Sequence, residues 1–259
     1  MEEPILYSLE NGVARIMLNR PAVFNSLNRD LALGLQRALR ESRDNAAVRA
    51  IYLSGEGRAF SAGQDLNEVT GENRIPMTTI LSEHYNPLIL LIREIEKPIV
   101  CGVNGVAAGA GANIALACDI TVAKESASFI QAFSKIGLIP DSGGTFFLPR
   151  IIGMQRAAAL MMLGEKVGAR DAEAMGMIYK VFPDEQFAVE SWKIAAHLAQ
   201  MPTLGLGLTK RALNLSMKNN LMEQLAMEEQ LQMQAGQSED YREGVAAFLE
   251  KRAPLFKGK

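Results

Sequence analysis

The sequence is poor in several residue types, and each shortage excludes a class of protein. It contains only two cysteines, Cys101 and Cys118, in 259 residues, too few for the disulfide framework of a small secreted domain. Both lie in apolar stretches, so we expect buried, reduced thiols and a cytoplasmic protein. Histidine is also scarce, with two residues, and we find no cluster of residues with the spacing of a metal site.

Charge and hydropathy argue against two kinds of partner. The formal net charge is −2, so the chain has no basic field to attract nucleic acid. No apolar run is long enough to span a bilayer, and the acidic residues 1–4 lack the apolar segment of a secretory signal. What is present is a chain with 48% hydrophobic and 22% charged residues. That is enough for a sizeable core in one globular domain, or one domain with a C-terminal extension.

The N-terminal segment carries a strong hairpin signal. Two strand-like runs, residues 5–10 and 13–18, flank the dipeptide Asn11-Gly12. Asparagine and glycine accept the positive φ angles of a type I′ turn, so this pattern predicts a tight β-hairpin. Further along, Asn28 is placed to cap a helix, because its side chain can accept a hydrogen bond from a free N–H of the first turn.

Strands and helices then alternate as far as about residue 153. Apolar strands are predicted over residues 50–53, 98–103 and 119–122, with helices over 80–96 and after a glycine-rich turn at 107–113. Such alternation is typical of an α/β fold with parallel strands.

The C-terminal part of the chain has a different character. From residue 184 to residue 249 the pattern is almost wholly helical, with breaks near Pro202, Asn219 and Gln237. We therefore expect several consecutive helices in this region.

The glycine-rich turn is the first candidate for chemistry. Gly109 and Gly111 let the backbone come close to a ligand, and the helix that begins here offers free N–H groups and the positive end of its dipole. That arrangement can stabilise an oxyanion. Tight packing against a strand also explains these glycines. A dinucleotide-binding fingerprint does not, because Ile114 stands where the third glycine of G-x-G-x-x-G is required.

Asp141 is the second candidate. It follows Pro140 and precedes Ser-Gly-Gly, a context in which aspartate commonly forms a turn or caps a helix. The tetrapeptide Asp-Ser-Gly-Gly also looks like the nucleophile segment of trypsin-like proteases. Those enzymes need a partnered histidine, and both His84 and His197 fall in predicted helices, so we set this interpretation aside.

Three segments together resemble the active site of the enoyl-CoA hydratase/isomerase (crotonase) superfamily. They are residues 60–66 (Phe-Ser-Ala-Gly-Gln-Asp-Leu), 107–113 (Ala-Ala-Gly-Ala-Gly-Ala-Asn) and 137–145 (Gly-Leu-Ile-Pro-Asp-Ser-Gly-Gly-Thr). The resemblance implies an α/β fold built as a crotonase-like spiral of ββα units over residues 1–195, followed by a C-terminal helical trimerisation region over 196–259. It also implies a homotrimer or hexamer and an acyl-CoA thioester substrate. No cofactor is implied beyond the coenzyme A that is part of the substrate.

The same resemblance assigns the reacting groups. The main-chain N–H groups of Gln64 and Ala110 match the pair that holds the thioester oxygen, where two fixed donors stabilise the charge of an enolate. Asn113 and Phe133 stand where hydratases of the family carry two glutamates, and neither side chain can activate water. Asp141 then remains as the acid/base, and burial in an apolar acyl pocket would raise its pKa towards neutrality.

The remaining substrate contacts are carried over position by position. Phe24, Asn25 and Leu27 match the loop that contacts the adenine and pantetheine arm of coenzyme A. Phe248 and Lys251 match residues that reach the coenzyme A of a neighbouring subunit, although an amphipathic helix with a solvated lysine would show the same pattern. Residues beside the two N–H donors complete the set: Ala62, Gly63, Asp65, Leu66, Gly109 and Gly111.

The segment around Asp141 is similar to that of the ring-epoxide isomerases of bacterial phenylacetate degradation. We therefore expect an acyl-CoA isomerase acting on an epoxyphenylacetyl-CoA thioester. A Δ3-Δ2 enoyl-CoA isomerase and an enoyl-CoA hydratase are the enzymatic alternatives. A non-catalytic acyl-CoA- or RNA-binding relative is the alternative of another class. The helix predicted after Asn28 argues against RNA binding, because its arginines are scattered along it and are balanced by acidic residues.

Overall fold

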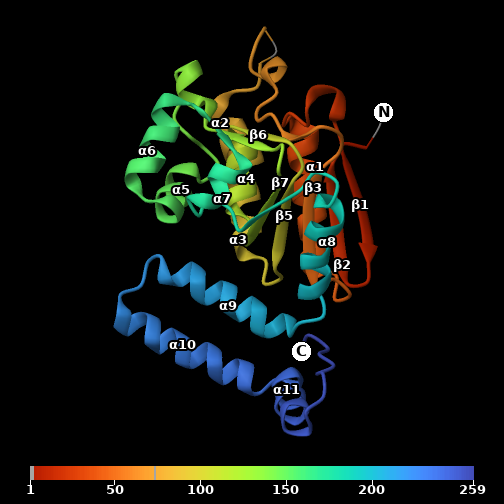
Figure 1. The fold of residues 1–259 in the computed structure, drawn as a ribbon. Helices are drawn as coiled ribbons and strands as arrows, with labels where there is room; N and C mark the ends of the chain where they lie inside the picture. The colour runs from red at the N-terminus through yellow and green to blue at the C-terminus, as the bar shows by residue number, and fades with distance from the viewer. Residues whose placement is uncertain (1–2, 73) are drawn as a thin grey trace.

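Two β-sheets organise the protein in the computed structural model, which describes residues 3–72 and 74–259 (Figure 1). The first sheet has the order β1-β2-β3-β5-β7-β10 and the second the order β4-β6-β8-β9. The strands of the first sheet are β1 (Ile5–Glu10), β2 (Val13–Leu18), β3 (Ala50–Gly55), β5 (Ile99–Val103), β7 (Ile120–Lys124) and β10 (Lys180–Phe182). Those of the second are β4 (Ala59–Ser61), β6 (Val106–Ala108), β8 (Ser128–Ile130) and β9 (Lys166–Gly168).

The chain winds between the two sheets as a spiral. Consecutive strands alternate, so that β3, β5 and β7 join the first sheet while β4, β6 and β8 join the second. The pairs β2–β3, β3–β5, β5–β7, β4–β6 and β6–β8 are all parallel. Helices follow the strand pairs and close each turn, among them α3 (Asn86–Glu94), α4 (Ala110–Ala117) and α5 (Gly144–Ile152). This is the ββα spiral expected from the sequence.

The local signals near the N-terminus are confirmed. Strands β1 and β2 pair antiparallel around Asn11 and Gly12, whose φ angles are 50° and 82°. The side chain of Asn28 accepts a hydrogen bond from the N–H of Leu31 and caps α1 (Arg29–Asp44). Of the N-terminal segment in which we expect no secretory signal, residues 1 and 2 lie outside the described residues.

The predicted helix over residues 80–96 is present, but it begins earlier and is not α-helical throughout. It consists of a short α2 (Met77–Thr79), a π-helical segment η3 (Ile80–Tyr85) and α3, which ends at Glu94. The strands of the second sheet were not predicted, because each has only three residues and is too short for an alternating pattern to register. Short 3₁₀ segments lie at η1 (Pro21–Val23), η2 (Leu66–Glu68) and η4 (Ala132–Ile136), and two small helices, α6 (Met154–Leu163) and α7 (Ala169–Ala174), follow α5.

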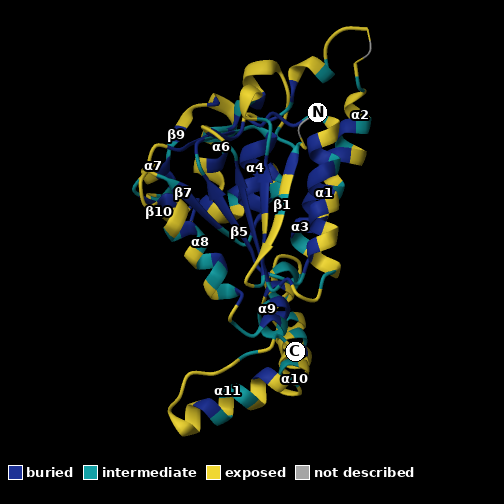
Figure 2. Ribbon diagram, turned by 90° about the vertical axis from the view of Figure 1, so that its right-hand side faces the viewer, coloured by how far each residue is buried: buried dark blue, intermediate teal, exposed yellow. Residues whose placement is uncertain are grey.

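The main hydrophobic core lies on the inner face of the first sheet, under α1, α3 and α4. Leu18, Leu53 and Phe60 belong to it and are fully buried. The outer face of the sheet is covered by α8 (Phe187–Leu198), whose Ala195 packs with Val13 and neighbouring residues. Both cysteines are buried and unpaired, as expected. In Figure 2 the inner face of α1 is buried while much of α10 and α11 is exposed.

The C-terminal helices lie together beyond the α/β core (Figure 1). They are α9 (Thr203–Ser216), α10 (Leu221–Gly236) and α11 (Glu239–Glu250), which confirms the predicted helical character and its breaks. The proposed boundary at residue 195 falls inside α8, which packs on the sheet, so the division into two regions stays a prediction. No helix within the described part of the chain is long and apolar enough to cross a membrane.

Candidate active site

One edge of the site is built by a short parallel contact between two loops. The N–H of Leu27 donates to the carbonyl of Gly63 at 2.7 Å, and the N–H of Asp65 donates to the carbonyl of Leu27 at 3.0 Å. Gln64 lies between these two bonds as the bridge partner of Leu27, so its own N–H points away from Leu27. Within residues 3–72 and 74–259, no hydrogen bond engages that N–H, which leaves it free to donate.

The opposite edge is the first turn of α4. Gly109 precedes it with φ 52° and ψ −126°, a backbone conformation that favours glycine. Ala110 is the first residue of the helix, so its N–H has no intrahelical acceptor. A Cβ on Gly111 would come within 2.6 Å of the Ser61 side chain, so the tight packing against β4 that we considered from the sequence is also real.

The two edges meet at Gly63. A Cβ on this residue would lie 3.6 Å from the amide nitrogen of Ala110 and 2.8 Å from the carbonyl oxygen of Ala108. The loop carrying Gln64 and the first turn of α4 are therefore in direct contact. The fold brings together the two main-chain donors that the sequence assigned to one oxyanion, although their common ligand stays a prediction.

Asp141 heads the turn that leads into α5. The N–H of Gly144 donates to the Asp141 carbonyl at 2.9 Å, and the central residues Ser142 and Gly143 have φ angles of 50° and 73°. The helix is capped by Gly143 without a side-chain hydrogen bond, so the N-cap interpretation of Asp141 is wrong and the turn interpretation is confirmed. The carboxylate accepts a hydrogen bond from the Ser142 hydroxyl at 2.9 Å.

The carboxyl group of Asp141 has a perturbed acidity. Burial raises its pKa from 3.8 to about 6, against the smaller opposing effect of the Ser142 hydroxyl. Desolvation disfavours the charged form of an acid, and the hydrogen bonds that favour the carboxylate are too weak to cancel this effect. A carboxylate with this pKa can take up and return a proton near neutral pH.

Asn113 holds the backbone of the Asp141 turn. Its Nδ2 donates to the Asp141 carbonyl at 2.8 Å, and its Oδ1 accepts from Nε2 of Gln131 at 2.8 Å. Both amides are buried. Phe133 is buried as well and lies beside the glycine turn, 3.7 Å from where a Cβ on Gly109 would be. Neither Asn113 nor Phe133 supplies an acid or a base.

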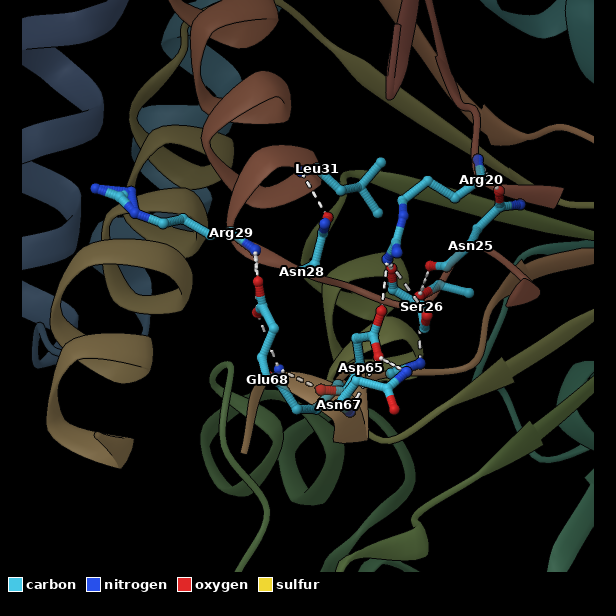
Figure 3. A network of polar contacts seen from close by, with 12 residues as sticks. Arg20, Asn25, Ser26, Asn28, Arg29, Leu31, Asp65, Asn67 and Glu68 are labelled. Carbon is cyan, nitrogen blue, oxygen red and sulfur yellow. Dashed lines mark hydrogen bonds and ion pairs between the residues drawn. The ribbon is translucent and has the colours of Figure 1, made fainter. Parts of the chain in front are cut away.

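An ion pair between Arg20 and Asp65 fastens the loop before α1, here called the early loop (residues 20–27), to the loop that carries Gln64, here called the donor loop (residues 62–66) (Figure 3). Nη1 of Arg20 lies 2.9 Å from Oδ2 of Asp65 and donates to the carbonyl of Ser26 at 2.6 Å. The other carboxylate oxygen of Asp65 accepts from the N–H of Asn67 at 3.1 Å, capping η2. Although burial opposes it, the hydrogen bond from Arg20 is the chief reason that the Asp65 pKa lies below its usual value. Asp65 is thus held as a structural anion.

The predicted coenzyme A loop has a mixed character. Asn25 is fully buried, and its side chain is engaged by the N–H of Arg20 and the carbonyls of Glu56 and Ala59. Its N–H donates to the Arg20 carbonyl at 2.9 Å and its carbonyl accepts from the Ser61 hydroxyl at 2.8 Å, so Asn25 shapes the loop and its contact with substrate stays a prediction. Phe24 is exposed, with the guanidinium of Arg58 lying 4.5 Å from its ring centroid.

Other predicted contacts are spread over the surface. Leu66 is exposed beside the donor loop, while Ala62 is tied to the early loop by its N–H, which donates to the Phe24 carbonyl at 2.9 Å. Phe248 and Lys251 lie on and just after α11, away from the rest of the site in this chain (Figure 1). Phe248 is 83% exposed. Their contacts with coenzyme A stay predictions.

Sequence reasoning missed three residues that shape the site: Arg20, Gln131 and Tyr85. Arg20 and Gln131 carry no local signal, because each acts on a residue far along the chain, Asp65 and Asn113 respectively. Tyr85 is fully buried, and its hydroxyl donates to Oε1 of Gln64. No local signal marks it, because the contact spans 21 residues and depends on the π-helical segment that the sequence did not predict.

The geometry does not support a serine protease or a metal centre in the described part of the chain. The Ser142 hydroxyl donates to Asp141 and is not paired with either histidine among residues 3–72 and 74–259. Within the same ranges, no group of three or more histidine, cysteine or carboxylate residues is placed to hold a metal ion.

Comparison with known proteins places this geometry in a family. The family described as enoyl-CoA hydratase/isomerase matches residues 8–259. A 1,2-epoxyphenylacetyl-CoA isomerase of Escherichia coli (strain K12) is 46% identical over 262 residues, covering all of both chains. A protein of Rhodobacter capsulatus named probable enoyl-CoA hydratase is 47% identical over 256 residues, covering 98% of each. The crystal structure of an enoyl-CoA hydratase from Bacillus anthracis superposes with a TM-score of 0.92 at 31% identity, covering 99% of this chain and 100% of that one. The chain therefore belongs to the enoyl-CoA hydratase/isomerase family.

Proposed function

We propose that this enzyme isomerises acyl-CoA thioesters through an enolate, with 2-(1,2-epoxy-1,2-dihydrophenyl)acetyl-CoA as its substrate. The observation that carries the proposal is Asp141, a partly buried carboxyl whose pKa is raised by burial to about 6, while positions 113 and 133 hold no acid. The full-length identity to the E. coli epoxyphenylacetyl-CoA isomerase supports this choice of acyl group.

The chemistry follows from the placement of the groups. The N–H groups of Gln64 and Ala110 would hold the thioester oxygen, so that negative charge arriving there on proton loss is stabilised in place. The Asp141 carboxylate takes a proton from the carbon next to the thioester, and the enolate's electrons move towards the ring. The ring expands to an oxepin as the C–C bond between the two epoxide carbons breaks and both C–O bonds are kept, and the same carboxyl returns the proton to a ring carbon. Atoms and charge balance, as an isomerisation requires.

Asn113 and Gln131 would act by positioning. Asn113 donates to the carbonyl of Asp141 itself, so the carboxyl is carried on a turn whose backbone is held from α4. A base held in this way needs little reorganisation when the proton moves. Both ends of the Asn113 amide are bonded to protein groups, and an amide cannot accept a proton from water, so Asn113 has no part in activating water.

Two related activities are the competing candidates. A Δ3-Δ2 enoyl-CoA isomerase needs the same hole and the same single acid/base, so the geometry admits it. Hydration is favoured by the name of the R. capsulatus relative, but it requires a group that activates water. Asn113 is engaged by Asp141 and Gln131, and Phe133 is apolar.

A turnover panel tests the proposal. The purified protein is given the phenylacetyl epoxide thioester, a 3-enoyl-CoA and a 2-enoyl-CoA at matched concentrations, and products are separated by mass-resolved chromatography. We expect fastest turnover of the epoxide, slower double-bond migration and very slow hydration. Faster turnover of the 3-enoyl-CoA would make the linear isomerase the better assignment. Absence of turnover with all three would favour a non-catalytic binding protein.

We also propose that the chain forms trimers or hexamers through its C-terminal helices. Large apolar side chains on α10 and α11 are exposed, with Met222 at 82% and Phe248 at 83%, and an apolar face of this kind marks an interaction site. Phe248 and Lys251 would then reach the coenzyme A of a neighbouring subunit. Sedimentation equilibrium at micromolar concentration is the test, and a stable monomer would refute it.

The two unpaired buried thiols are in keeping with a reducing compartment, and we propose a cytoplasmic enzyme.

A further inference from the structure

We propose that Tyr85 is a positioning residue of the oxyanion hole. Its hydroxyl holds the side-chain amide of Gln64, and in this way fixes the main-chain N–H of the same residue against the thioester oxygen. This inference rests on the proposed function, because Tyr85 can position a donor of the oxyanion hole only if that hole binds the thioester oxygen.

The contact is made in a buried setting. Tyr85 is 1% exposed, and its hydroxyl donates to Oε1 of Gln64. Burial is the main cause of a pKa far above the usual value for tyrosine, and the charges of Asp141, Glu68 and Asp65 add to it. The hydroxyl therefore stays protonated throughout the physiological range and remains a donor.

The other end of the Gln64 amide is held as well. Its Nε2 donates to the carbonyl of Asp65 at 3.1 Å and lies 3.5 Å from Oε2 of Glu68. The Glu68 carboxylate is itself fastened to α1, because it accepts the N–H of Arg29 at 2.8 Å (Figure 3). The amide thus lies between the π-helical segment on one side and η2 on the other.

Tyr85 is presented by a backbone that is fixed in turn. It is the last residue of η3, and π-helical segments occur mainly as single turns at functional sites. Nε2 of Gln36, a buried residue of α1, donates to the carbonyls of Glu83 and His84 at 2.7 and 2.9 Å. These bonds pin the backbone of the last turn of the π segment to α1, so the backbone that carries the phenol is fixed relative to α1.

The consequence concerns the transition state more than substrate binding. The main chain on either side of Gln64 is bonded to Leu27, and both ends of its side-chain amide are held. The Gln64 peptide therefore has little freedom to tilt, and its N–H stays aimed at the position of the developing charge. A preorganised donor of this kind stabilises the transition state selectively. Without the phenol hydroxyl, the donor remains but its direction is less well defined. We expect kcat to fall about tenfold, less than the 100- to 1000-fold typical of deleting a donor, while KM changes by less than about threefold.

The test compares Tyr85→Phe with Tyr52→Phe. Tyr52 is a matched control, since it is 5% exposed and its hydroxyl bonds to Ser191 at 2.8 Å, but it lies in the separate cluster under α8. The probe is trans-cinnamoyl-CoA, whose thioester carbonyl stretch is recorded by vibrational difference spectroscopy on the bound enzyme. This readout reports polarisation of the carbonyl and needs no turnover.

We expect the wild type and Tyr52→Phe to lower the carbonyl frequency equally, and Tyr85→Phe to lower it less. An equal shift in Tyr85→Phe would overturn the inference while leaving the oxyanion hole intact. No shift in the wild type would show that the proposed hole does not bind the carbonyl, and the proposed function and the inference would fall together. Loss of kcat in both tyrosine variants would point to general destabilisation and would also overturn the inference.

A double-mutant cycle with Gln64→Met tests the route of the effect. Methionine keeps the length of the side chain but offers Tyr85 no carbonyl oxygen. If Tyr85 acts through the Gln64 amide, adding Tyr85→Phe to Gln64→Met should change kcat by less than about twofold. Full additivity of the two losses would show that the phenol acts elsewhere, and the assignment as a positioning residue would be wrong.

Discussion

Replacing Asp141 with asparagine should separate proton transfer from every other property of the site. Asparagine has nearly the same shape and can still accept the hydrogen bond from the Ser142 hydroxyl, which the Asp141 carboxylate accepts at 2.9 Å. The bonds from Gly144 and Asn113 go to the main-chain carbonyl and are unaffected. We expect unchanged acyl-CoA affinity and a kcat at least about 100-fold lower, the usual size of a general acid/base contribution.

The pH dependence follows from the same carboxyl. With a pKa of about 6, roughly nine-tenths of the groups are ionised at pH 7 and roughly one-tenth at pH 5. If the carboxylate is the base, kcat/KM should fall about tenfold between these values along a limb with its midpoint near pH 6, because kcat/KM reports ionisation of the free enzyme. The residual kcat/KM of Asp141→Asn should lack this limb. Measuring both proteins with the same substrate separates ionisation of the carboxyl from ionisation of the coenzyme A phosphates, which is common to both.

The contribution of Asp141 to the stability of the wild type should fall over the same pH range in which activity rises. The pKa of this acid is higher in the folded state than its ordinary value of 3.8, so folding disfavours the ionised form. The cost is absent below pH 3.8, grows as the pH rises towards 6 and is complete above that. A shift of about two units corresponds to at most about 3 kcal/mol. Asp141→Asn should therefore be more stable than the wild type at pH 8, and similar to it at pH 4, in denaturant titrations.

Two results would refute this reasoning. Near-normal turnover by Asp141→Asn would remove the residue from the chemistry, whatever its pKa. A pH-independent stability difference between the two proteins would show that the carboxyl is not desolvated in solution, and the physical basis for its raised pKa would be lost.

Three further predictions concern other parts of the chain. Ala110→Pro deletes one proposed donor at a helix position that tolerates proline and should lower kcat/KM by about 100- to 1000-fold, whereas the matched Ala110→Gly should change it by less than about threefold; equal effects in both variants would contradict a role for the amide. Crotonyl-CoA hydration should be at least about 100-fold slower than isomerisation, because Asn113 and Phe133 cannot activate water, and comparable rates in a coupled absorbance assay would show that these positions are misassigned. Asp119→Ala should lower the free energy of unfolding by about 3 to 5 kcal/mol, since it leaves Lys210, 2.8 Å away and 6% exposed, and Arg93, 3.0 Å away, without their anion; an unchanged melting temperature would show that these ion pairs do not hold α9 on the core.

Local features of the protein could be read from the sequence because neighbouring residues determine them. Asn11 and Gly12 accept positive φ angles that few residues adopt, so the hairpin does not depend on the rest of the fold. The cap at Asn28 and the helix that follows the glycine turn are also decided within a few residues. The absence of an acid at positions 113 and 133, and its presence at 141, needs no coordinates, and it already favours isomerisation over hydration.

The joining of distant segments was decided only by the tertiary structure. The strands of the second sheet have three residues each, and they form strands because the spiral brings them side by side rather than through any pattern of their own. Asp65 becomes a buried anion only because Arg20, 45 positions earlier, reaches it. Burial of Asp141, and hence its raised pKa, depends on all the elements that exclude water from it. The contact between Tyr85 and Gln64 is made from the end of a π-helical segment, which helix propensities do not distinguish from an α-helix. Sequence alone thus determined which chemical groups are available, whereas packing between segments far apart in the chain determined their direction, protonation and rigidity.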